Sequence, residues 1–501
     1  MINRSKAGAS PGQAFMAGSL LLFQNDLRIE DHPALHAART EADWVCPLFV
    51  WSPADEKPWA PGAASRWWLH HSLLALQERL AGRGAPFVIR SGDVSETVQA
   101  VAKETGAESV YWSARYEPHT AALQSDLRKD LQKRGLKVRI FPGRTLFDPS
   151  TLLNKSHEPF QVFTPFWRSC VARIEEAGLP QAIPTPRHLT PPPRRVRSQE
   201  VADLGLLPKI PWDAEFGPTW KPGEEGAHKR LRHLLGIAAQ YHDLRNRPDL
   251  DGTSALSPHL HFGEITPRQI AQAVLDEFGV TPQEWSRLPE GPRVFLAEIG
   301  WREFAHAVLY HFPQTDRAPL KSKFEAFPWK YAQRPLRTWQ RGLTGYPIVD
   351  AGMRQLWRTG WMHNRVRMIV GSFLTKDLLQ SWQAGAEWFW DTLVDADLAN
   401  NTLGWQWISG CGADASPYFR IFNPIMQGRR YDPEGSYIRQ WVPELAKLPA
   451  DVIHEPWTAA PEVLSGAGVV LGETYPQPMV DHAAARVAAL EALAKMKDAR
   501  D

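Results

Sequence analysis

The hydrophobic pattern of this 501-residue chain changes its period near residue 150, and this change limits the possible folds more than any other feature. Up to that point, short apolar runs alternate with amphipathic stretches of helical period. Strands that alternate with helices in this way form a parallel, doubly wound sheet. The runs that we predict to be strands are residues 20–23, 45–51, 86–90, 109–112 and 136–141.

Residues 19–149 are therefore predicted to form a Rossmann-like α/β domain. Its clearest helical stretches are residues 63–80 and 121–134, and Asp93-Val-Ser-Glu96 has the spacing of a capping box that opens another helix. Ligands of such sheets bind near the carboxyl ends of the strands. The sequence contains neither G-x-G-x-x-G nor a Walker motif, so it does not indicate a standard dinucleotide or nucleoside triphosphate site.

The chain after residue 150 has a different character. Residues 150–223 are rich in proline, for example at Pro191-Pro-Pro193, and are predicted to be an interdomain linker with one short helix near residues 163–177. Residues 224–501 are almost wholly helical in period. The helices that we predict there are residues 227–246, 266–278, 293–310, 350–359, 363–379 and 384–395, with an Ala-rich helix after His482.

Composition narrows the possible function classes. The formal net charge is only +2, so binding of nucleic acid would depend on a local basic patch. The three cysteines lie far apart without metal-ligand spacing, which argues against a zinc site or a disulfide framework. Residues 1–18 are predicted to be a disordered extension, or sequence ahead of a start at Met16, rather than a signal peptide. Because no apolar stretch is long enough to span a bilayer, the sequence predicts a cytoplasmic protein with no metal and no membrane partner.

One short region mixes residue types that suit a hydrophobic core poorly. It contains Trp361-Met-His-Asn-Arg-Val-Arg-Met368, then Asp395 to Asn401, then Trp405-Gln-Trp407. Residues 354–368 carry four arginines and no acidic residue. A solvated helix face would explain the arginines alone, but the tryptophans between them favour a groove that follows phosphates and stacks bases. The mixture indicates a site for a polar, redox-active cofactor beside a polyanion.

Two further segments have residues suited to such a site. Gly252-Thr-Ser254 precedes a helix and offers backbone N–H groups and hydroxyls to a phosphate, although a simple N-cap is the alternative. Glu298 and Trp301 lie three residues apart on one face of a predicted helix. The indole could stack on a base while the carboxyl group bonds its edge; a core tryptophan near a surface glutamate is the alternative.

These motifs resemble those of the photolyase/cryptochrome family, and the resemblance extends over residues 19–478. It implies an N-terminal α/β domain followed by a large all-α C-terminal domain that binds FAD. Asn401 would face the flavin N5 atom, and Arg367, paired with Asp395, would stabilise the reduced flavin. The residues that the resemblance assigns to FAD are Tyr241, Thr253, Ser254, Ala255, Leu256, Ser257, Arg302, Arg367, Asp395, Asp397 and Asn401.

The resemblance also implies a partner, damaged DNA with a flipped-out pyrimidine dimer. Glu298 would protonate the dimer or form a hydrogen bond to it. Trp405, Trp382 and Trp329 match an electron relay from the surface to the flavin. Glu298, Asn401 and these three indoles are therefore the predicted catalytic residues. The residues assigned to DNA are Arg245, Glu298, Trp301, Asn364, Arg365, Met368 and Trp407.

Three positions indicate the branch of the family. Photolyases for (6-4) lesions have histidines where this chain has Asn364 and Met368, and DASH-type cryptochromes tend to lack the indole that matches Trp407. The resemblance therefore implies light-dependent repair of cyclobutane pyrimidine dimers by electron transfer from excited FADH⁻, as in bacterial photolyases of class I or III. The alternative is a cryptochrome-type blue-light photoreceptor without repair activity. A flavoprotein oxidoreductase is a third interpretation, which no nicotinamide motif supports.

The α/β domain resembles the antenna module of the same family. Residues 59–68 and 111–117 are candidate contacts for a light-harvesting chromophore. Glu117 matches a glutamate that binds the pterin edge of folate, and Trp67 is a second candidate, with core packing of Trp67 and Trp68 as the alternative. Residues 59–68 look more like class III than class I enzymes, which favours methenyltetrahydrofolate over 8-hydroxy-deazaflavin. We expect a monomer.

Overall fold

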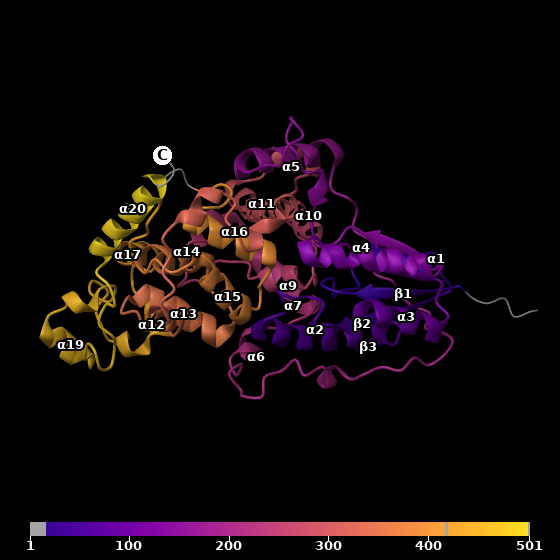
Figure 1. Ribbon diagram of the computed structural model, residues 1–501, viewed down its shortest axis with the longest axis horizontal. Coiled ribbons are helices and arrows are strands. Elements are labelled where there is room, and N and C mark those ends of the chain that lie inside the picture. The colour runs from indigo at the N-terminus through magenta and orange to yellow at the C-terminus, as the bar shows by residue number, and fades with distance from the viewer. Residues whose placement is uncertain (1–16, 416–418, 499–501) are drawn as a thin grey trace, which may run out of the picture.

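The computed structural model describes residues 17–415 and 419–498. The predicted extension, residues 1–18, falls almost entirely outside the described residues. Figure 1 shows an α/β part that contains the sheet and, beside it, a helical part with the C-terminal helices at its far end.

The sheet has five parallel strands in the order β3-β2-β1-β4-β5, which confirms the prediction of a doubly wound sheet. Leu20 of the central strand β1 lies opposite Cys46 of β2 and Val110 of β4. β1 is buried along its whole length, so its sequence is a continuous apolar run rather than an alternating one. The strands are β1 (Gly18–Phe23), β2 (Trp44–Trp51), β3 (Val88–Ser91), β4 (Ser109–Ser113) and β5 (Lys137–Phe141).

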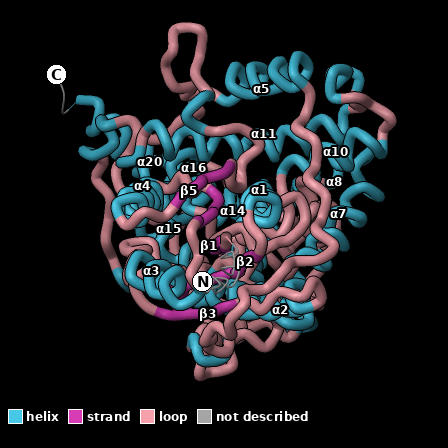
Figure 2. Tube along the Cα trace, turned by 90° about the vertical axis from the view of Figure 1, so that its right-hand side faces the viewer, coloured by secondary structure: helices cyan, strands magenta, loops and turns pink. Residues whose placement is uncertain are grey.

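Helices cover both faces of the sheet, as the end-on view in Figure 2 shows. α1 and α2 pack with Leu21 and Phe23 on one face. α3 and α4 pack with Leu20 and Leu22 on the other face. Alternate residues of one strand therefore belong to two different hydrophobic cores. These helices are α1 (Pro33–Glu41), α2 (Ala63–Ala81), α3 (Val94–Thr105) and α4 (Pro118–Lys133).

The strand order reverses at β1, because β2 lies on one side of it and β4 on the other. In doubly wound sheets, ligands bind at this reversal, in the crevice beyond the carboxyl ends of the strands. The residues that follow β1, β2 and β4 therefore frame a potential ligand site.

The helical part is built around the long helix α11, which packs against α16, α8 and α5. α16 also packs against α14 and α15. The helices that follow the sheet are α5 (Phe163–Ala177), α6 (Phe216–Thr219), α7 (Glu224–Ile237), α8 (Tyr241–Leu244), α9 (Ser257–His261), α10 (Pro267–Glu277), α11 (Glu290–His311), α12 (Gln333–Gln340), α13 (Pro347–Thr359), α14 (Asn364–Ser372), α15 (Trp382–Thr392), α16 (Leu398–Ser409), α17 (Pro424–Tyr431), α18 (Ser436–Trp441), α19 (Pro461–Ala467) and α20 (His482–Asp498).

The linker contacts both parts of the molecule. Its helix α5, at the position predicted from periodicity, packs on the helical part, where the rings of Phe166 and Phe304 lie 5.1 Å apart. The proline-rich chain that follows runs in extended form along the α/β part towards α6 (Figure 1). Its backbone bonds to the edge strand β3, where Gln199 N–H donates to Ile89 O.

The structure differs from the prediction of one continuous helix over residues 227–246. α7 ends at Ile237, a 3-10 turn follows over Ala238–Gln240, and α8 then begins. The carbonyl oxygen of Ala238 lies 2.3 Å from where a Cβ at Gly291, near the start of α11, would stand. This close approach of two backbones is a tertiary constraint, which hydrophobic periodicity does not reveal.

The prediction of one α-helix over residues 363–379 is wrong in its second half. α14 ends at Ser372 and a π-helix follows over Phe373–Asp377. The wider turn buries Lys376, whose Nζ donates to Ser409 O, 2.7 Å away at the C-terminal end of α16. π-helical turns are rare, and this one is accompanied by a contact with a distant helix, so the sequence period could not predict it.

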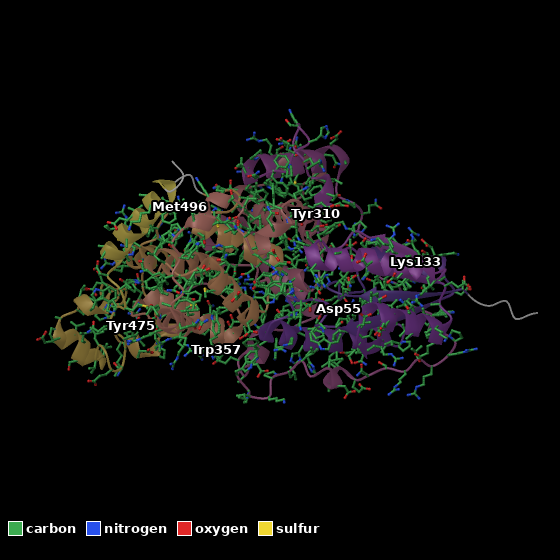
Figure 3. The ribbon with its side chains drawn as sticks, viewed as in Figure 1. Asp55, Lys133, Tyr310, Trp357, Tyr475 and Met496 are labelled. Atoms are coloured by element: carbon green, nitrogen blue, oxygen red, sulfur yellow. The ribbon has the colours of Figure 1, made fainter. Side chains whose placement is uncertain are left out.

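Tyr475, which Figure 3 labels, attaches the C-terminal segment to the helical part. Its hydroxyl donates to Asp350 Oδ2 at 2.7 Å, and Asp350 Oδ1 accepts from Thr344 N–H at 2.7 Å. All three residues are fully buried. The segment that ends in α20 is therefore part of the same folded body.

Candidate active site

Arg367 of α14 is fixed by two partners. Its Nη2 donates to both oxygens of Asp395, at 3.1 and 2.8 Å, and its Nε donates to Met362 O at 2.7 Å. Asp395 lies in the turn between α15 and α16 and is almost completely buried. The pair places one oriented guanidinium at the junction of α14 and α16, as the sequence predicts.

Asp397 is the buried centre of a larger network. It caps α16, because its Oδ1 accepts from Asn400 N–H at 3.0 Å. Its Oδ2 faces Arg144 Nη1 at 3.4 Å, His306 Nε2 at 3.5 Å and His261 Nδ1 at 3.8 Å. Burial alone would raise its pKa, but these groups outweigh burial and hold the pKa of Asp397 well below its usual range.

Both histidines beside Asp397 are buried. Burial, with Arg302 and Arg144 nearby, lowers the pKa of His306 to about 4. Asp397 opposes this effect without cancelling it, so His306 is neutral at physiological pH.

Arg302 of α11 brings a donor to the same network. Its Nη1 donates to Arg144 O at 2.8 Å and to Glu303 Oε1 at 3.3 Å. Its Nη2 is buried and has no hydrogen-bond partner among the described residues. A buried guanidinium nitrogen without an acceptor is costly, so this atom is suited to a bound polar ligand.

The loop before α9 is held from behind by Arg230 of α7. Arg230 donates to Ser254 O at 2.9 Å and to Thr253 O at 3.0 Å. Ala255 has a positive φ of 49°, a conformation that costs a non-glycine residue about 1–2 kcal/mol. With its carbonyl groups held by Arg230, the loop is fixed in an unusual conformation, as a preformed ligand cradle would be.

Two adjacent residues where this loop meets α9 differ in exposure. Leu256 is buried, whereas Ser257, the first residue of α9, is exposed and accepts from Trp361 Nε1 at 3.3 Å. Trp361 in turn lies under the guanidinium of Arg367, 5.9 Å from its ring centroid. The structure thus joins the Gly-Thr-Ser motif to the Trp361–Met368 motif, more than a hundred residues away.

Asn401 is oriented by α15. Its Nδ2 donates to Ala386 O at 3.0 Å, and its backbone N–H donates to Asp397 O within α16. The amide therefore lies one turn after Asp397 on α16.

A second ion pair joins Arg245, which follows α8, to Glu298 of α11. Arg245 Nη1 contacts Glu298 Oε1 at 2.6 Å, and its guanidinium lies over the ring of Tyr241 at 5.9 Å. Burial raises the pKa of Glu298, although Arg245 opposes this effect. The three predicted residues therefore form one contact group.

Arg365 lies beside this group, and together with Arg245 it forms a basic surface. Its Nη2 and Nε donate to Asn246 Oδ1 at 2.7 and 3.2 Å, and its guanidinium stacks over the Tyr431 ring at 4.5 Å. Asn364, at the start of the same helix, is exposed, and Met368 is half-buried one turn later.

The two predicted stacking indoles occupy different surroundings. Trp301 lies parallel to Phe163 of α5, with ring centroids 3.8 Å apart and an interplanar angle of 8°. Trp407 is half-buried at the edge of the main helical core. Phe163 thus covers one face of the Trp301 ring.

The predicted relay tryptophans share one hydrophobic core. Trp405 and Trp382 are buried in it, and Trp329 packs against it partly exposed. Lys330 N–H donates to Leu379 O, which brings Trp329 to the segment before Trp382. Trp329 therefore lies nearer the surface than the two buried indoles.

Gly385 fixes the position of the Trp405 indole. A Cβ at this position would lie 2.1 Å from the Trp405 ring, closer than any packed atoms can approach. Only glycine leaves room for the ring here.

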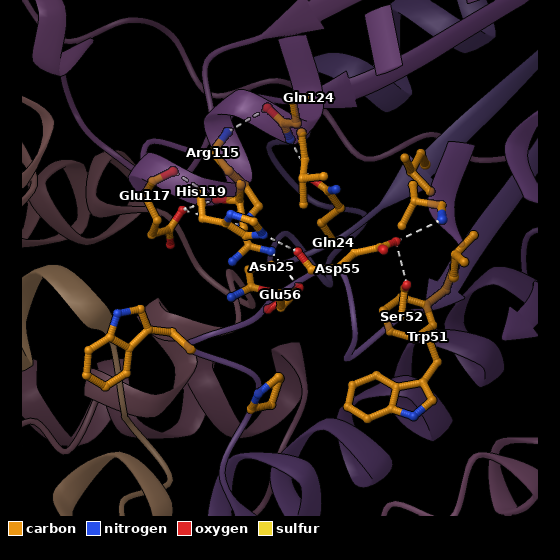
Figure 4. Close-up of a pocket in the computed structure, with 18 of the residues that line it drawn as sticks. Gln24, Asn25, Trp51, Ser52, Asp55, Glu56, Arg115, Glu117, His119 and Gln124 are labelled. Atoms are coloured by element: carbon orange, nitrogen blue, oxygen red, sulfur yellow. Dashed lines mark hydrogen bonds and ion pairs between the residues drawn. The ribbon is translucent and has the colours of Figure 1, made fainter. Parts of the chain in front are cut away.

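A cavity lies where the sheet order reverses, beyond the carboxyl ends of β1, β2 and β4 (Figure 4). Gln24, Ser52 and Glu117 follow these three strands and line it. Figure 4 shows Arg115 and Glu117 on one wall and Trp51 on another. Phe262, Trp390 and Leu398 of the helical part also line this cavity, so it lies between the two parts.

The two antenna candidates lie in different places. Glu117 lines the cavity, but its carboxylate is engaged by Arg144 and, at 3.4 Å, by Arg115. Trp67 does not line the cavity; it is 3% exposed and packs edge-on against Phe216 at 5.2 Å. The core-packing alternative therefore describes the position of Trp67.

A row of buried charges connects this cavity with the helical site. Arg115 contacts Glu56 at 2.8 Å and Glu117, and Arg144 contacts both Glu117 and Asp397. Burial would raise the pKa of Glu117, but Arg144 and Arg115 hold it far below its usual range. Arg144 is thus shared by one carboxylate from each part of the molecule.

Sequence analysis missed the residues that hold the site together. Arg144, Arg230, Asn246, His261 and His306 contact predicted site residues, yet none stands in a recognisable motif. Their partners are distant in sequence, so spacing carries no signal of the contact.

The described residues contain no group of three or more His, Cys, Asp and Glu side chains arranged to hold a metal ion. In the same ranges, no helix combines the length and the apolar character needed to cross a membrane.

Known proteins match nearly the whole chain. A family model described as DNA photolyase matches residues 19–187, and one described as the FAD binding domain of DNA photolyase matches residues 295–495. A deoxyribodipyrimidine photo-lyase of Agrobacterium fabrum is 44% identical over 483 residues, which span 95% of this chain and 98% of that protein. Cryptochrome-2 of Arabidopsis thaliana is 38% identical over 96% of this chain and 79% of its own length.

Solved structures agree with the sequence matches. A bacterial class III photolyase from Agrobacterium tumefaciens superposes with a TM-score of 0.91 at 43% identity, covering 98% of this chain and 100% of that one. A cryptochrome from Synechocystis superposes with a TM-score of 0.85 at 29% identity, covering 95% and 99%.

Replacing Arg144 by methionine should destabilise the protein in acid. The depressed pKa values of Asp397 and Glu117 contribute stability above about pH 4, which is lost as the pH falls through their folded-state values. Without Arg144 both pKa values rise, so acid unfolding should begin at a higher pH. At neutral pH the loss of the cation that these two buried carboxylates share should cost about 3–5 kcal/mol.

Circular dichroism during acid titration, and denaturant unfolding at pH 7, measure both effects. Arg139→Met, which breaks the exposed pair with Glu41, is the matched control and should leave both curves unchanged. Equal curves for Arg144→Met and Arg139→Met would contradict the central role of Arg144.

Proposed function

The chain belongs to the DNA photolyase family, and we propose that it is a deoxyribodipyrimidine photo-lyase, which uses light to repair cyclobutane pyrimidine dimers in DNA. The observation that carries the proposal is that two arginines of α14, Arg365 and Arg367, point to different sides of the helix. Arg367 pairs with the buried Asp395, whereas Arg365 joins the basic surface beside Arg245 and Glu298. Residues two apart on a helix point to nearly opposite sides, so one helix serves a cofactor and a polyanion.

FAD is the cofactor, and the donors and acceptors of the helical site fit it. The buried Nη2 of Arg302 lacks an acceptor, and the hydroxyls of Thr253 and Ser257 lie on the loop held by Arg230. Arg367 and Asp395 would hold a fixed positive charge beside the flavin ring system, where it stabilises the reduced form. When bound and reduced, FAD supplies the electron that opens the dimer after light absorption.

The basic surface is suited to damaged DNA. Arg365 and Arg245 would contact phosphates, which gives affinity that depends on salt and little on sequence. Trp301 and Trp407 offer indole faces on which a flipped-out dimer can stack. Asn364 and Met368 line the same side of α14, and neither is the histidine expected for a (6-4) lesion.

Glu298 would change partners when the dimer binds. In the structure its carboxylate contacts Arg245 at 2.6 Å. If Arg245 moves to a phosphate, Glu298 is left to form a hydrogen bond to the dimer. Because burial raises its pKa, Glu298 holds a proton at higher pH than an ordinary glutamate and can donate one.

For the antenna we propose methenyltetrahydrofolate rather than 8-hydroxy-deazaflavin, bound in the cavity at the strand-order reversal. Glu117 is the predicted residue that lines this cavity, and Trp67 lies outside it. Gln24, Asn25 and Arg115 add polar groups that suit the edge of a heterocycle. The monomeric state and the cytoplasmic location remain predictions.

Blue-light repair of a dimer-containing oligonucleotide by the fully reduced protein tests the function. Repair supports the photolyase assignment, and its absence with reduced flavin would favour the cryptochrome-type photoreceptor to which the chain is also similar. The absorption spectrum of the purified protein identifies the antenna, because folate and deazaflavin absorb at different wavelengths.

Glu298→Ala should lower dimer affinity about tenfold and also reduce repair yield, because a charge-assisted hydrogen bond is lost. Glu298→Gln keeps a donor and should retain more yield than the alanine variant. Affinity is measured by titration of dimer-containing DNA, and yield by repair per absorbed photon. Wild-type values for Glu298→Ala would remove this residue from the site.

Trp405→Phe should block photoreduction of oxidised FAD, since phenylalanine is much harder to oxidise than tryptophan. It should spare repair when the flavin is reduced chemically. Trp339→Phe is the matched control, because Trp339 is equally buried, lies 6.2 Å from Trp405 and is outside the predicted relay. Absorbance under blue light follows both variants, and unchanged photoreduction in Trp405→Phe would refute the relay.

A further inference from the structure

Arg365 differs from the other arginines of the site in the kind of partner that holds it. Both Nη2 and Nε donate to one neutral atom, Oδ1 of Asn246, at 2.7 and 3.2 Å. The Tyr431 ring, with its centroid 4.5 Å from the guanidinium carbon, supports the group from one face. No carboxylate among the described residues lies within ion-pair distance of Arg365.

The acidic residues on the neighbouring segments are already engaged. Glu298 contacts Arg245 at 2.6 Å, and Asp249 contacts Arg247 at 2.5 Å. The two oxygens of Asp432, next to Tyr431, accept from backbone N–H groups of α18 at 3.0 Å each. Asn246 is therefore the residue that decides whether the Arg365 charge is balanced.

The surroundings of Arg365 are positive. Burial lowers its pKa; Tyr431 opposes this effect, but the neighbouring Arg245, Arg430 and Arg420 add to it. An arginine that is held firmly, half-buried and uncompensated is a strong site for an anion. An aspartate at position 246 would hold the same guanidinium equally well but would cancel its charge.

We propose that Asn246 is a positioning residue that orients Arg365 without neutralising it, so that Arg365 presents its full charge to one DNA phosphate. This inference rests on the proposed function, because the anion is a phosphate of the bound DNA. Arg245, by contrast, must first leave Glu298 before its charge is available. The basic surface thus has one arginine that is ready for DNA and one that is released on binding.

Two substitutions separate orientation from charge. Asn246→Asp keeps an oxygen acceptor and adds a negative charge, so the slope of log K against log salt should fall by about one phosphate contact. Asn246→Ala removes the acceptor and keeps the charge, so affinity should fall several-fold while the slope stays near that of the wild type.

Asn154→Asp is the matched control, because Asn154 caps an exposed linker turn through the same oxygen and the change adds the same charge. It should leave affinity and slope unchanged. The measurement is fluorescence anisotropy of a labelled dimer-containing duplex over a salt series, with the FAD-loaded protein checked by circular dichroism.

Each outcome bears on a different claim. A wild-type slope in Asn246→Asp would overturn the charge argument, and wild-type affinity in Asn246→Ala would overturn the positioning argument. If the unaltered protein neither prefers damaged DNA nor repairs it, the proposed function fails instead, whatever these variants do.

Discussion

The guanidinium of Arg144 connects the two parts of the molecule through charge rather than through apolar contact. It lies between Glu117, which borders the cavity of the α/β part, and Asp397, which caps α16 in the helical part. Buried carboxylates without a cation would be neutralised or would unfold the protein. The position of α16, and with it Asn401 and Trp405, therefore depends on an arginine that precedes the linker.

α14 contributes to two sites at once, the cofactor site through Arg367 and the basic surface through Arg365. His363 begins the helix, with its Nδ1 accepting from Arg365 N–H at 3.2 Å, and burial lowers the pKa of His363 to about 3. A neutral imidazole can accept this hydrogen bond, whereas an imidazolium could not. The cap sets the rotation of the first turns, so that Arg365 and Arg367 point away from each other.

Periodicity predicted the parts of the fold that depend on local pattern. The five strands, α5 and α20 lie where the apolar period places them, whereas the breaks at Ala238 and Phe373 arise from packing against distant helices. The site divides in the same way. Motif residues such as Arg367 and Asp395 could be named in advance, but Arg144 and Asn246 could not, because their partners lie 253 and 119 residues away. Trp67 shows the opposite case: its motif suggested a chromophore contact, but the side chain packs in the core of the α/β part.

Gly385 has a consequence for how charge would pass through the protein. Its missing side chain lets the Trp405 ring lie directly against the backbone of α15, and Phe389 packs against the ring edge-on at 5.0 Å. A ring buried this tightly among apolar neighbours cannot rotate, and few polar groups lie around it that would need to reorient. The reorganisation energy of the Trp405 indole is therefore kept low by Gly385, a residue that has no redox chemistry of its own.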